Sequence, residues 1–384
     1  MTASRFFLHT GIALFTLALG CNRNNLGNRI CDDPADCPEE CEDPAVCPEA
    51  EIVGLVVSPN APVLNSEDGS QPTQQFLVYG LRQDGARSSK PLVATFTAPS
   101  NSIGGIDSRS GVFMASGEVG GTVTMSATAT SNDKLLRGNF QVTVNITRTY
   151  YAPGTPGDAG SHFGVPPVID PAKSAQLRYP LDGVVMPQNV YPADIQWQNG
   201  VAGDFYKITI RKPNITLIAY SLHKGAGYTY DYLPDGKGWI GVTQSNPDDD
   251  AMLSVDRFEA GSGTVYGEGS PIKMHFADGS LLGSIYYWDI AAGRIRRIDD
   301  GTANRFDFMP TPPTSPIDGQ NCVGCHAVSR DGRYMLGRLG GGNNVAGVFD
   351  LTRDLTGNPA PSEYPISAAL PQFFISSWNN DNTR

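Results

Sequence analysis

The fold is decided by residues 106–127, IDSRSGVFMASGEVGGTVTMSA. Apolar and polar residues alternate over Thr122–Ala127, and this alternation is typical of a strand that buries one face. The turn-forming residues Asp107, Gly111 and Gly117 precede this alternating run. The stretch therefore predicts short β-strands separated by turns.

Runs of the same kind lie on both sides of this stretch. Turn residues separate them at the short intervals that are typical of a β-sandwich. The expected strands are Ile52–Pro59, Gln75–Leu81, Ala94–Phe96, Thr122–Ala127 and Asn139–Asn145. We therefore predict one β-sandwich domain over residues 52–147.

Residues 106–127 resemble the bacterial Ig-like domains of group 2. Those domains carry a turn of the pattern D/N-x-x-x-G-x-F/V, which corresponds to Asp107–Phe113 here. The pattern G-x-x-x-G-x-V-x-V-x-A follows it and corresponds to Gly117–Ala127. The resemblance implies a stalk or adhesive module with no chemistry of its own.

A second β domain is expected over residues 176–300, after a Pro- and Gly-rich linker at residues 148–175. Its opening resembles a fibronectin type III-like sandwich, a family in which the tryptophan of an early strand, here Trp197, is a core residue. The segments that carry the resemblance are Tyr179–Gly183, Asp194–Trp197 and Asp204–Ile210. Gly283–Ile290 and Gly293–Ile298 alternate around a turn, which predicts a terminal hairpin.

The segment 301–384 has a different pattern. Ser329-Arg-Asp-Gly-Arg333 predicts a turn followed by a strand, and Asn344–Leu351 supplies the partner strand. This segment resembles the S-P-D-G-K/R repeat of TolB-type β-propellers, and a second copy begins at Ser377. Propeller blades bury their faces only against neighbouring blades, so we expect an incomplete propeller-like segment, from a truncated chain or one that pairs with another chain.

Cys322-Val-Gly-Cys325-His326 is the one motif with cofactor chemistry. In c-type cytochromes two cysteines at this spacing form thioethers to the haem, and the adjacent histidine ligates the iron. The motif therefore makes Cys322, Cys325 and His326 candidate residues for haem c, with His326 as the metal ligand.

Two other interpretations of this motif stay open. Haem-binding CxxCH segments usually open a helix, whereas a β-turn and strands follow the motif here. A short disulfide between Cys322 and Cys325 would staple the loop, and another metal is the third possibility. If haem is bound, the sixth ligand would come from Met309, Met335, His275 or a more distant histidine.

The N-terminus predicts export. The apolar run Phe6–Leu19 is too short and too interrupted to span a bilayer, and it has the proportions of a signal-peptide core. Ala18-Leu19-Gly20-Cys21 resembles the lipobox of bacterial lipoproteins. The resemblance implies a signal peptide at residues 1–20, a lipid on Cys21 and attachment to the cell outer membrane. A soluble secreted protein with an ordinary cleavage site is the alternative.

Residues 21–51 are expected to remain an extended, acidic segment that buries too little apolar surface to fold. A ten-residue repeat within this segment contains four cysteines. Export would place them in an oxidising compartment, where two disulfides are expected. The candidates are Cys31, Cys37, Cys41 and Cys47. A zinc site is the alternative, although the spacing lacks the usual paired knuckles.

The composition and the motifs that the sequence lacks narrow the classes of function to be expected. A net charge of −11 would repel nucleic-acid phosphates, so nucleic acid is not an expected partner. No nucleophile motif or phosphate-binding loop indicates an enzyme. The sequence predicts an all-β lipoprotein of tandem sandwich domains that binds an envelope or extracellular protein or polysaccharide, or serves as a scaffold. A haem-bearing protein for electron transfer or redox sensing is the alternative.

Overall fold

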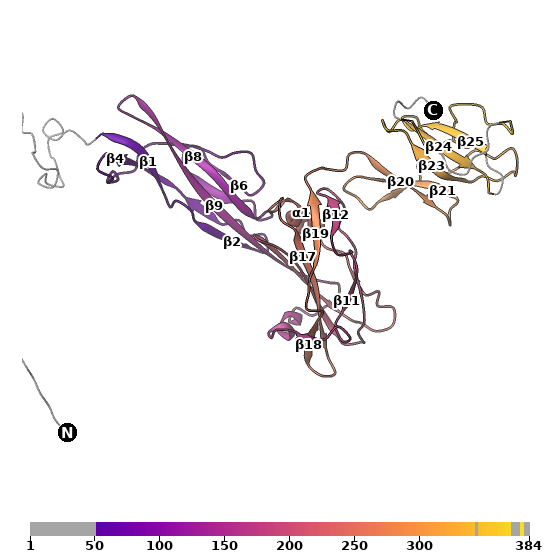
Figure 1. Ribbon diagram of the computed structural model, residues 1–384, viewed down its shortest axis with the longest axis horizontal. Helices are drawn as coiled ribbons and strands as arrows, with labels where there is room; N and C mark the ends of the chain where they lie inside the picture. Colours follow the sequence, from indigo (N-terminus) through magenta and orange to yellow (C-terminus); the bar gives the residue numbers. More distant parts are fainter. Residues whose placement is uncertain (1–50, 342–344, 370–376, 380–384) are drawn as a thin grey trace, which may run out of the picture.

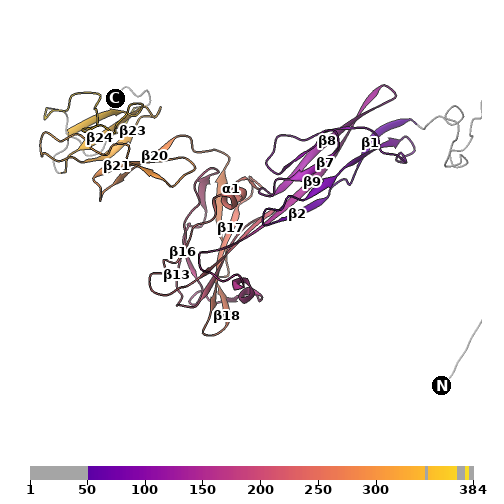
Figure 2. The same ribbon diagram turned by 180° about the vertical axis from the view of Figure 1, so that it is seen from behind.

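The computed structural model describes residues 51–341, 345–369 and 377–379 (Figure 1). Nearly all regular structure in these residues is β, which confirms the predicted class of tandem β-sandwich domains. Two sandwich domains and a C-terminal unit follow one another along the chain, as the view from behind also shows (Figure 2). No helix within the described ranges is long and apolar enough to cross a membrane.

The first domain is built on one long hairpin. β8 (Gly121–Ser131) and β9 (Lys134–Tyr151) make a long antiparallel hairpin with alternate residues buried. The phenylalanine rings of Phe76, Phe113 and Phe140 are fully buried between its sheets and hold them together. The remaining strands are β1 (Ile52–Ser58), β2 (Val63–Glu67), β3 (Thr73–Gln75), β4 (Leu77–Arg82), β5 (Thr95–Thr97), β6 (Gly104–Ile106) and β7 (Val112–Ala115).

β9 continues from the first domain into the second. Its C-terminal part pairs in parallel with β15 (Ile215–Leu222), from Ile146 opposite Ile215 to Tyr151 opposite Tyr220. The same strand also pairs with β8 and β2 of the first domain. A single sheet of eleven strands therefore runs through both domains.

The second domain is a sandwich of that shared sheet against a smaller one. The large sheet adds β10 (Val168–Ile169), β12 (Val184–Pro187), β14 (Phe205–Lys212), β17 (Ala251–Glu259), β18 (Thr264–Gly267) and β19 (Ile272–Ala277). The small sheet holds β11 (Gln176–Tyr179), β13 (Ile195–Gln198) and β16 (Asp231–Tyr232). Trp197 on β13 is buried between them, which confirms its predicted core position.

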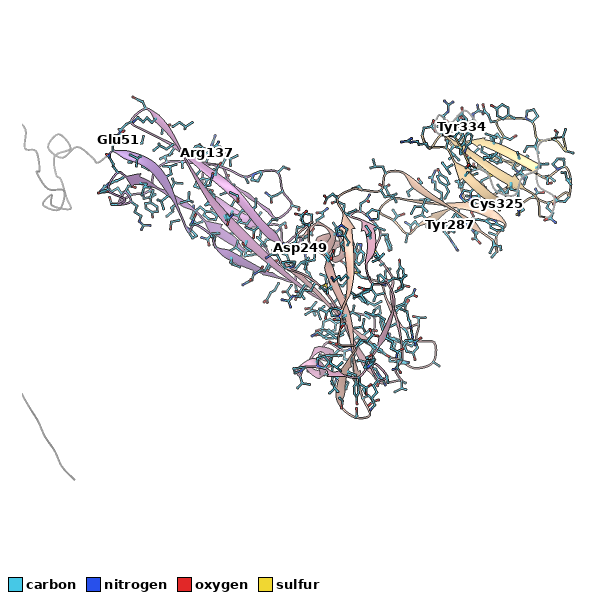
Figure 3. The ribbon with its side chains drawn as sticks, in the orientation of Figure 1. Glu51, Arg137, Asp249, Tyr287, Cys325 and Tyr334 are labelled. Atoms are coloured by element: carbon cyan, nitrogen blue, oxygen red, sulfur yellow. The ribbon has the colours of Figure 1, made fainter. Side chains whose placement is uncertain are left out.

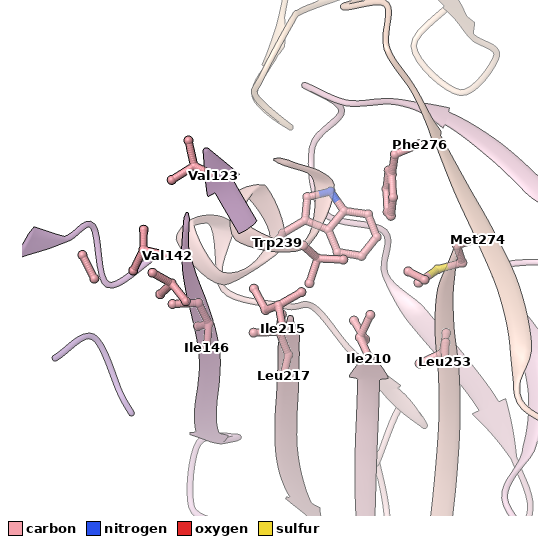
Figure 4. Packing of buried hydrophobic residues seen from close by; sticks show 14 of the residues in the cluster. Val123, Val142, Ile146, Ile210, Ile215, Leu217, Trp239, Leu253, Met274 and Phe276 are labelled. Atoms are coloured by element: carbon pink, nitrogen blue, oxygen red, sulfur yellow. The ribbon is translucent and has the colours of Figure 1, made fainter. Parts of the chain in front are cut away.

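A short helix, α1 (Gly236–Gln244), lies beside this core. Asp235 caps it, because its carboxylate accepts the Lys237 and Gly238 N–H groups at 3.0 Å. Trp239 on the helix is fully buried, and its Nε1–H donates to the Val190 carbonyl at 3.1 Å. Figure 4 shows this indole among apolar side chains of both domains, so the core is continuous across the junction.

The segment expected as a linker, residues 148–175, is largely packed against the second domain. The end of β9, the 3₁₀ helix η2 (Ala159–Phe163) and β10 all lie within it. His162 of η2 stacks between Phe205 and Phe258, with ring centroids 4.6 and 4.4 Å away. The sequence did not predict these elements, because each is very short and the segment is rich in Pro and Gly.

The C-terminal unit contains two three-stranded sheets around a core of its own. One sheet holds β20 (Ser284–Asp289), β21 (Arg294–Asp299) and β22 (Arg305–Phe306), and the other holds β23 (Val323–Val328), β24 (Tyr334–Leu339) and β25 (Val345–Asp350). The hairpin β20–β21, expected at the end of the second domain, contributes Ile295 to this separate core. The predicted turn forms at Ser329, whose carbonyl accepts the Gly332 N–H at 2.8 Å. The propeller-like nature of the unit stays a prediction.

Candidate functional site

The CxxCH motif lies on β23, where the strand contains a β-bulge. Between Gly324 and Ala327 the strand advances three residues while β24 advances two, so one residue is extra. Cys325 takes up the irregularity with a φ of +38°, in the left-handed region. The bulge therefore re-aims Cys325 and His326 relative to a regular strand. Figure 3 shows Cys325 on the C-terminal unit.

Two indole rings border the motif. A Cβ on Gly324 would lie 3.1 Å from the Trp288 ring, so the glycine leaves room for that ring against the strand. On the C-terminal side, Trp378 donates its Nε1–H to the Ala327 carbonyl at 2.9 Å. The bulge is thus held between side chains from two other segments.

His326 is oriented by a backbone carbonyl. Its Nε2 lies 3.2 Å from the Tyr286 carbonyl oxygen, and because a carbonyl only accepts, Nε2 carries the proton. Burial lowers the pKa of His326, against the smaller raising effect of that carbonyl. The imidazole is therefore neutral at pH 7 and presents Nδ1 as a lone-pair donor, as metal-binding histidines do.

The two cysteines are half-buried free thiols. Burial raises the pKa of the Cys322 thiol, although the Arg338 guanidinium acts in the opposite direction. A thiol with a raised pKa is a weak nucleophile at neutral pH. Cys322 differs in this respect from the activated cysteine of a catalytic site.

Two thiols and an imidazole, the residue types that hold haem c, lie on one short, partly buried segment. The proposed sixth ligands are less suited. Met309 and Met335 are fully buried in the C-terminal core and would have to leave it. His275 lies on β19 of the second domain, with Nδ1 at 3.1 Å from Asp250. Within the described residues, no three His, Cys, Asp or Glu side chains are arranged to hold a metal ion.

The remaining predicted site residues cannot be placed. Cys21, Cys31, Cys37, Cys41 and Cys47 lie outside the described residues. The lipid anchor and the two disulfides therefore stay predictions from sequence.

A second constellation, which the sequence pattern did not reveal, lies where the sandwich domains meet. Four asparagine side chains form a chain of amide hydrogen bonds, with lengths of 3.1, 2.8 and 2.9 Å. They are Asn65, Asn145, Asn214 and Asn246. Because an amide both donates and accepts, each member can bond on either side. The chain connects β2 and β9 of the first domain to two loops of the second.

The backbones at this junction are in direct contact. The Gly120 N–H of the first domain donates to Ser245 Oγ at 2.8 Å. A Cβ on Gly120 would lie 2.0 Å from the Asn214 carbonyl oxygen, so only glycine fits here. The buried ammonium of Lys212 donates to the Ser245 carbonyl at 2.9 Å, and burial lowers its pKa. The two domains are therefore packed tightly.

No protein-family model matches the chain, and no curated protein matches it in sequence. Among solved structures it is similar to a protocadherin gammaB7 EC3-6 cis-dimer, at 13% identity and a TM-score of 0.21, with 58% of this chain and 51% of that chain covered. It is also similar to Clostridium thermocellum CbhA fibronectin(III)-like modules, at 12% identity and a TM-score of 0.18, covering 61% and 99%.

A third similar structure is an ICAM-5 D1-D4 ectodomain fragment, at 9% identity and a TM-score of 0.19, covering 77% of this chain and 75% of that chain. The chain spans about half the length of the protocadherin fragment. TM-scores this low support no inference about function. The fold class stated above rests on the sheets of the chain itself.

Proposed function

We propose that this chain is a lipid-anchored protein of the cell envelope whose two sandwich domains act together as a rigid binding or structural module. The shared strand β9 is the observation that carries the rigid-module part of the proposal, and the lipid anchor rests on the sequence before Cys21. Sandwich domains joined by a flexible linker reorient freely. Here the sheet, the asparagine chain and the apolar core all cross the junction, which favours one fixed orientation. The expected partner is an envelope or extracellular protein or polysaccharide.

Single-molecule energy transfer tests the rigidity. Dyes attached through non-natural residues at Leu135, on the tip of the first domain, and at Ser262, in the second, should give one narrow distance distribution. Both positions are exposed. A pair within the second domain, Val185 and Ser262, sets the width expected for a rigid body. A Leu135–Ser262 distribution much broader than this reference would contradict the rigid module.

The second candidate function is that of a haem-bearing redox lipoprotein. The observation that favours it is the neutral, carbonyl-oriented imidazole of His326 on the same bulge as Cys325. Cys322 and Cys325 would hold the haem covalently and His326 would bind its iron. The group would supply one-electron chemistry.

Expression with c-type haem maturation should give a protein that keeps its haem after denaturation, seen as a pyridine haemochrome band. Replacing both Cys322 and Cys325 with Ala should abolish the band, because both thioether positions are lost. Cys31→Ala is the matched control and should leave the band unchanged. No band in the unsubstituted protein, with Cys322 and Cys325 joined in a disulfide, would instead support the structural staple.

A further inference from the structure

One edge of β17 contains a gap in its pairing. Residues 257–259 pair with β18 and residues 251–253 pair with β19, so Ser254, Val255 and Asp256 have no strand partner on that side. The chain between β18 and β19 leaves the sheet at this point. A cavity of about 250 Å³ opens there. Its lining includes Pro167, Ile169, Leu177, Asp256, Gly267 and Glu268.

Two carboxylates, of Asp256 and Glu268, line the cavity. Within the described residues, the Asp256 carboxylate makes no hydrogen bond or ion pair. Burial raises its pKa, and Lys207, its register partner on β14, offsets this only in part. Glu268 accepts one long bond, from the Leu177 N–H at 3.4 Å. A cation entering the cavity would therefore meet two carboxylates that are not engaged in an ion pair with another residue of the described chain.

Gly267 keeps part of the cavity open because it has no side chain. A Cβ on Gly267 would lie 3.0 Å from Asp256 Oδ1 and 3.2 Å from Pro167 Cβ. The glycine thus keeps open the space in front of the carboxylate. Ile169, on the neighbouring β10, is 59% exposed and forms an apolar wall that faces water.

We propose that this cavity binds a primary ammonium group on an apolar stem, such as a lysine side chain of a partner peptide. The carboxylates of Asp256 and Glu268 would pair with the ammonium. The walls formed by Pro167, Ile169 and Leu177 would cover its methylene groups. A calcium ion would instead need about six to eight oxygen ligands, which two carboxylates between apolar walls do not supply. The site lies within the second domain and stands independently of the rigid-module function.

Calorimetric titration of the full chain tests the proposal with two matched compounds. Nα-acetyl-lysine N-methylamide should bind at least tenfold more tightly than the norleucine analogue, which has an apolar stem but no charge. Asp256→Asn should weaken lysine binding at least tenfold. Gly267→Ala should weaken it as well, by placing a methyl group against the carboxylate. Asp300→Asn removes an exposed carboxylate of the C-terminal unit and should change nothing.

Three outcomes would overturn the proposal. The first is a lysine compound that binds no better than its norleucine analogue. The second is lysine binding that survives both Asp256→Asn and Gly267→Ala, which would place the ammonium elsewhere. The third is glucosamine binding as tightly as the lysine compound, which would show that the apolar stem is not recognised. Should Asp256→Asn fail to fold, the Gly267→Ala variant and the compound comparison still decide the question.

Discussion

The Gly120→Ala variant should lose about 3 kcal/mol of folding free energy through overpacking at the domain junction. Its new Cβ would lie 2.0 Å from the Asn214 carbonyl oxygen. That oxygen accepts the Ile146 N–H at 2.9 Å, so the backbones of β9 and the β14–β15 turn must separate. The loss corresponds to a fall of roughly 6–12 °C in Tm, which differential scanning calorimetry measures. The distance distribution between Leu135 and Ser262 should broaden in the same variant.

Gly105→Ala is the matched control for this prediction. Gly105 lies on β6, its φ is not positive, and a Cβ there would meet no atom within 4 Å. Its folding free energy should change by no more than about 0.5 kcal/mol. If both variants proved equally stable, the packing at Gly120 would not hold the two domains together.

The Cys21→Ala variant should move from the membrane fraction to the soluble exported fraction almost completely. Without the thiol no diacylglycerol can be attached, and the protein loses the acyl chains that would anchor it. Radiolabelled palmitate should be incorporated into the unsubstituted protein and not into the variant. Fractionation of the cells measures the redistribution.

Cys31→Ala controls for the loss of any N-terminal cysteine. It should keep both the palmitate label and the membrane fraction, because its predicted role is a disulfide in the acidic segment. An unlabelled, soluble wild-type protein would support the alternative of ordinary secretion. A Cys21→Ala variant that remains labelled would show that another residue carries the lipid.

Sequence alternation was sufficient to predict much of the two sandwich domains. The period of two over Thr122–Ala127 places every second residue of β8 in the core, and tertiary packing agrees with it. The expected strand Gln75–Leu81 is instead divided at Phe76, because β3 pairs with β7 and β4 pairs with β1. A strand that crosses between two sheets keeps its alternation, so the sequence does not show the break.

The pairing of β9 with β15 could not be predicted from the sequence, because it joins residues that are distant along the chain. Strand pairing depends on long-range contacts, whereas alternation reports only which face of a strand is buried. The candidate site was also predicted only in part. Residue types and spacing identify Cys322, Cys325 and His326, but the bulge that re-aims them arises from their register with β24. The Asp256 cavity likewise depends on β17 changing partners.

The parallel pairing of β9 and β15 also has a mechanical consequence. If the chain were anchored at its N-terminus and pulled through its C-terminal unit, tension would act along these two strands and in opposite directions. Their hydrogen bonds from Ile146 to Tyr151 would then be loaded in shear and share the force. A hairpin pulled open from one end breaks its bonds one after another. The two domains should therefore unfold together, in one event at a single rupture force.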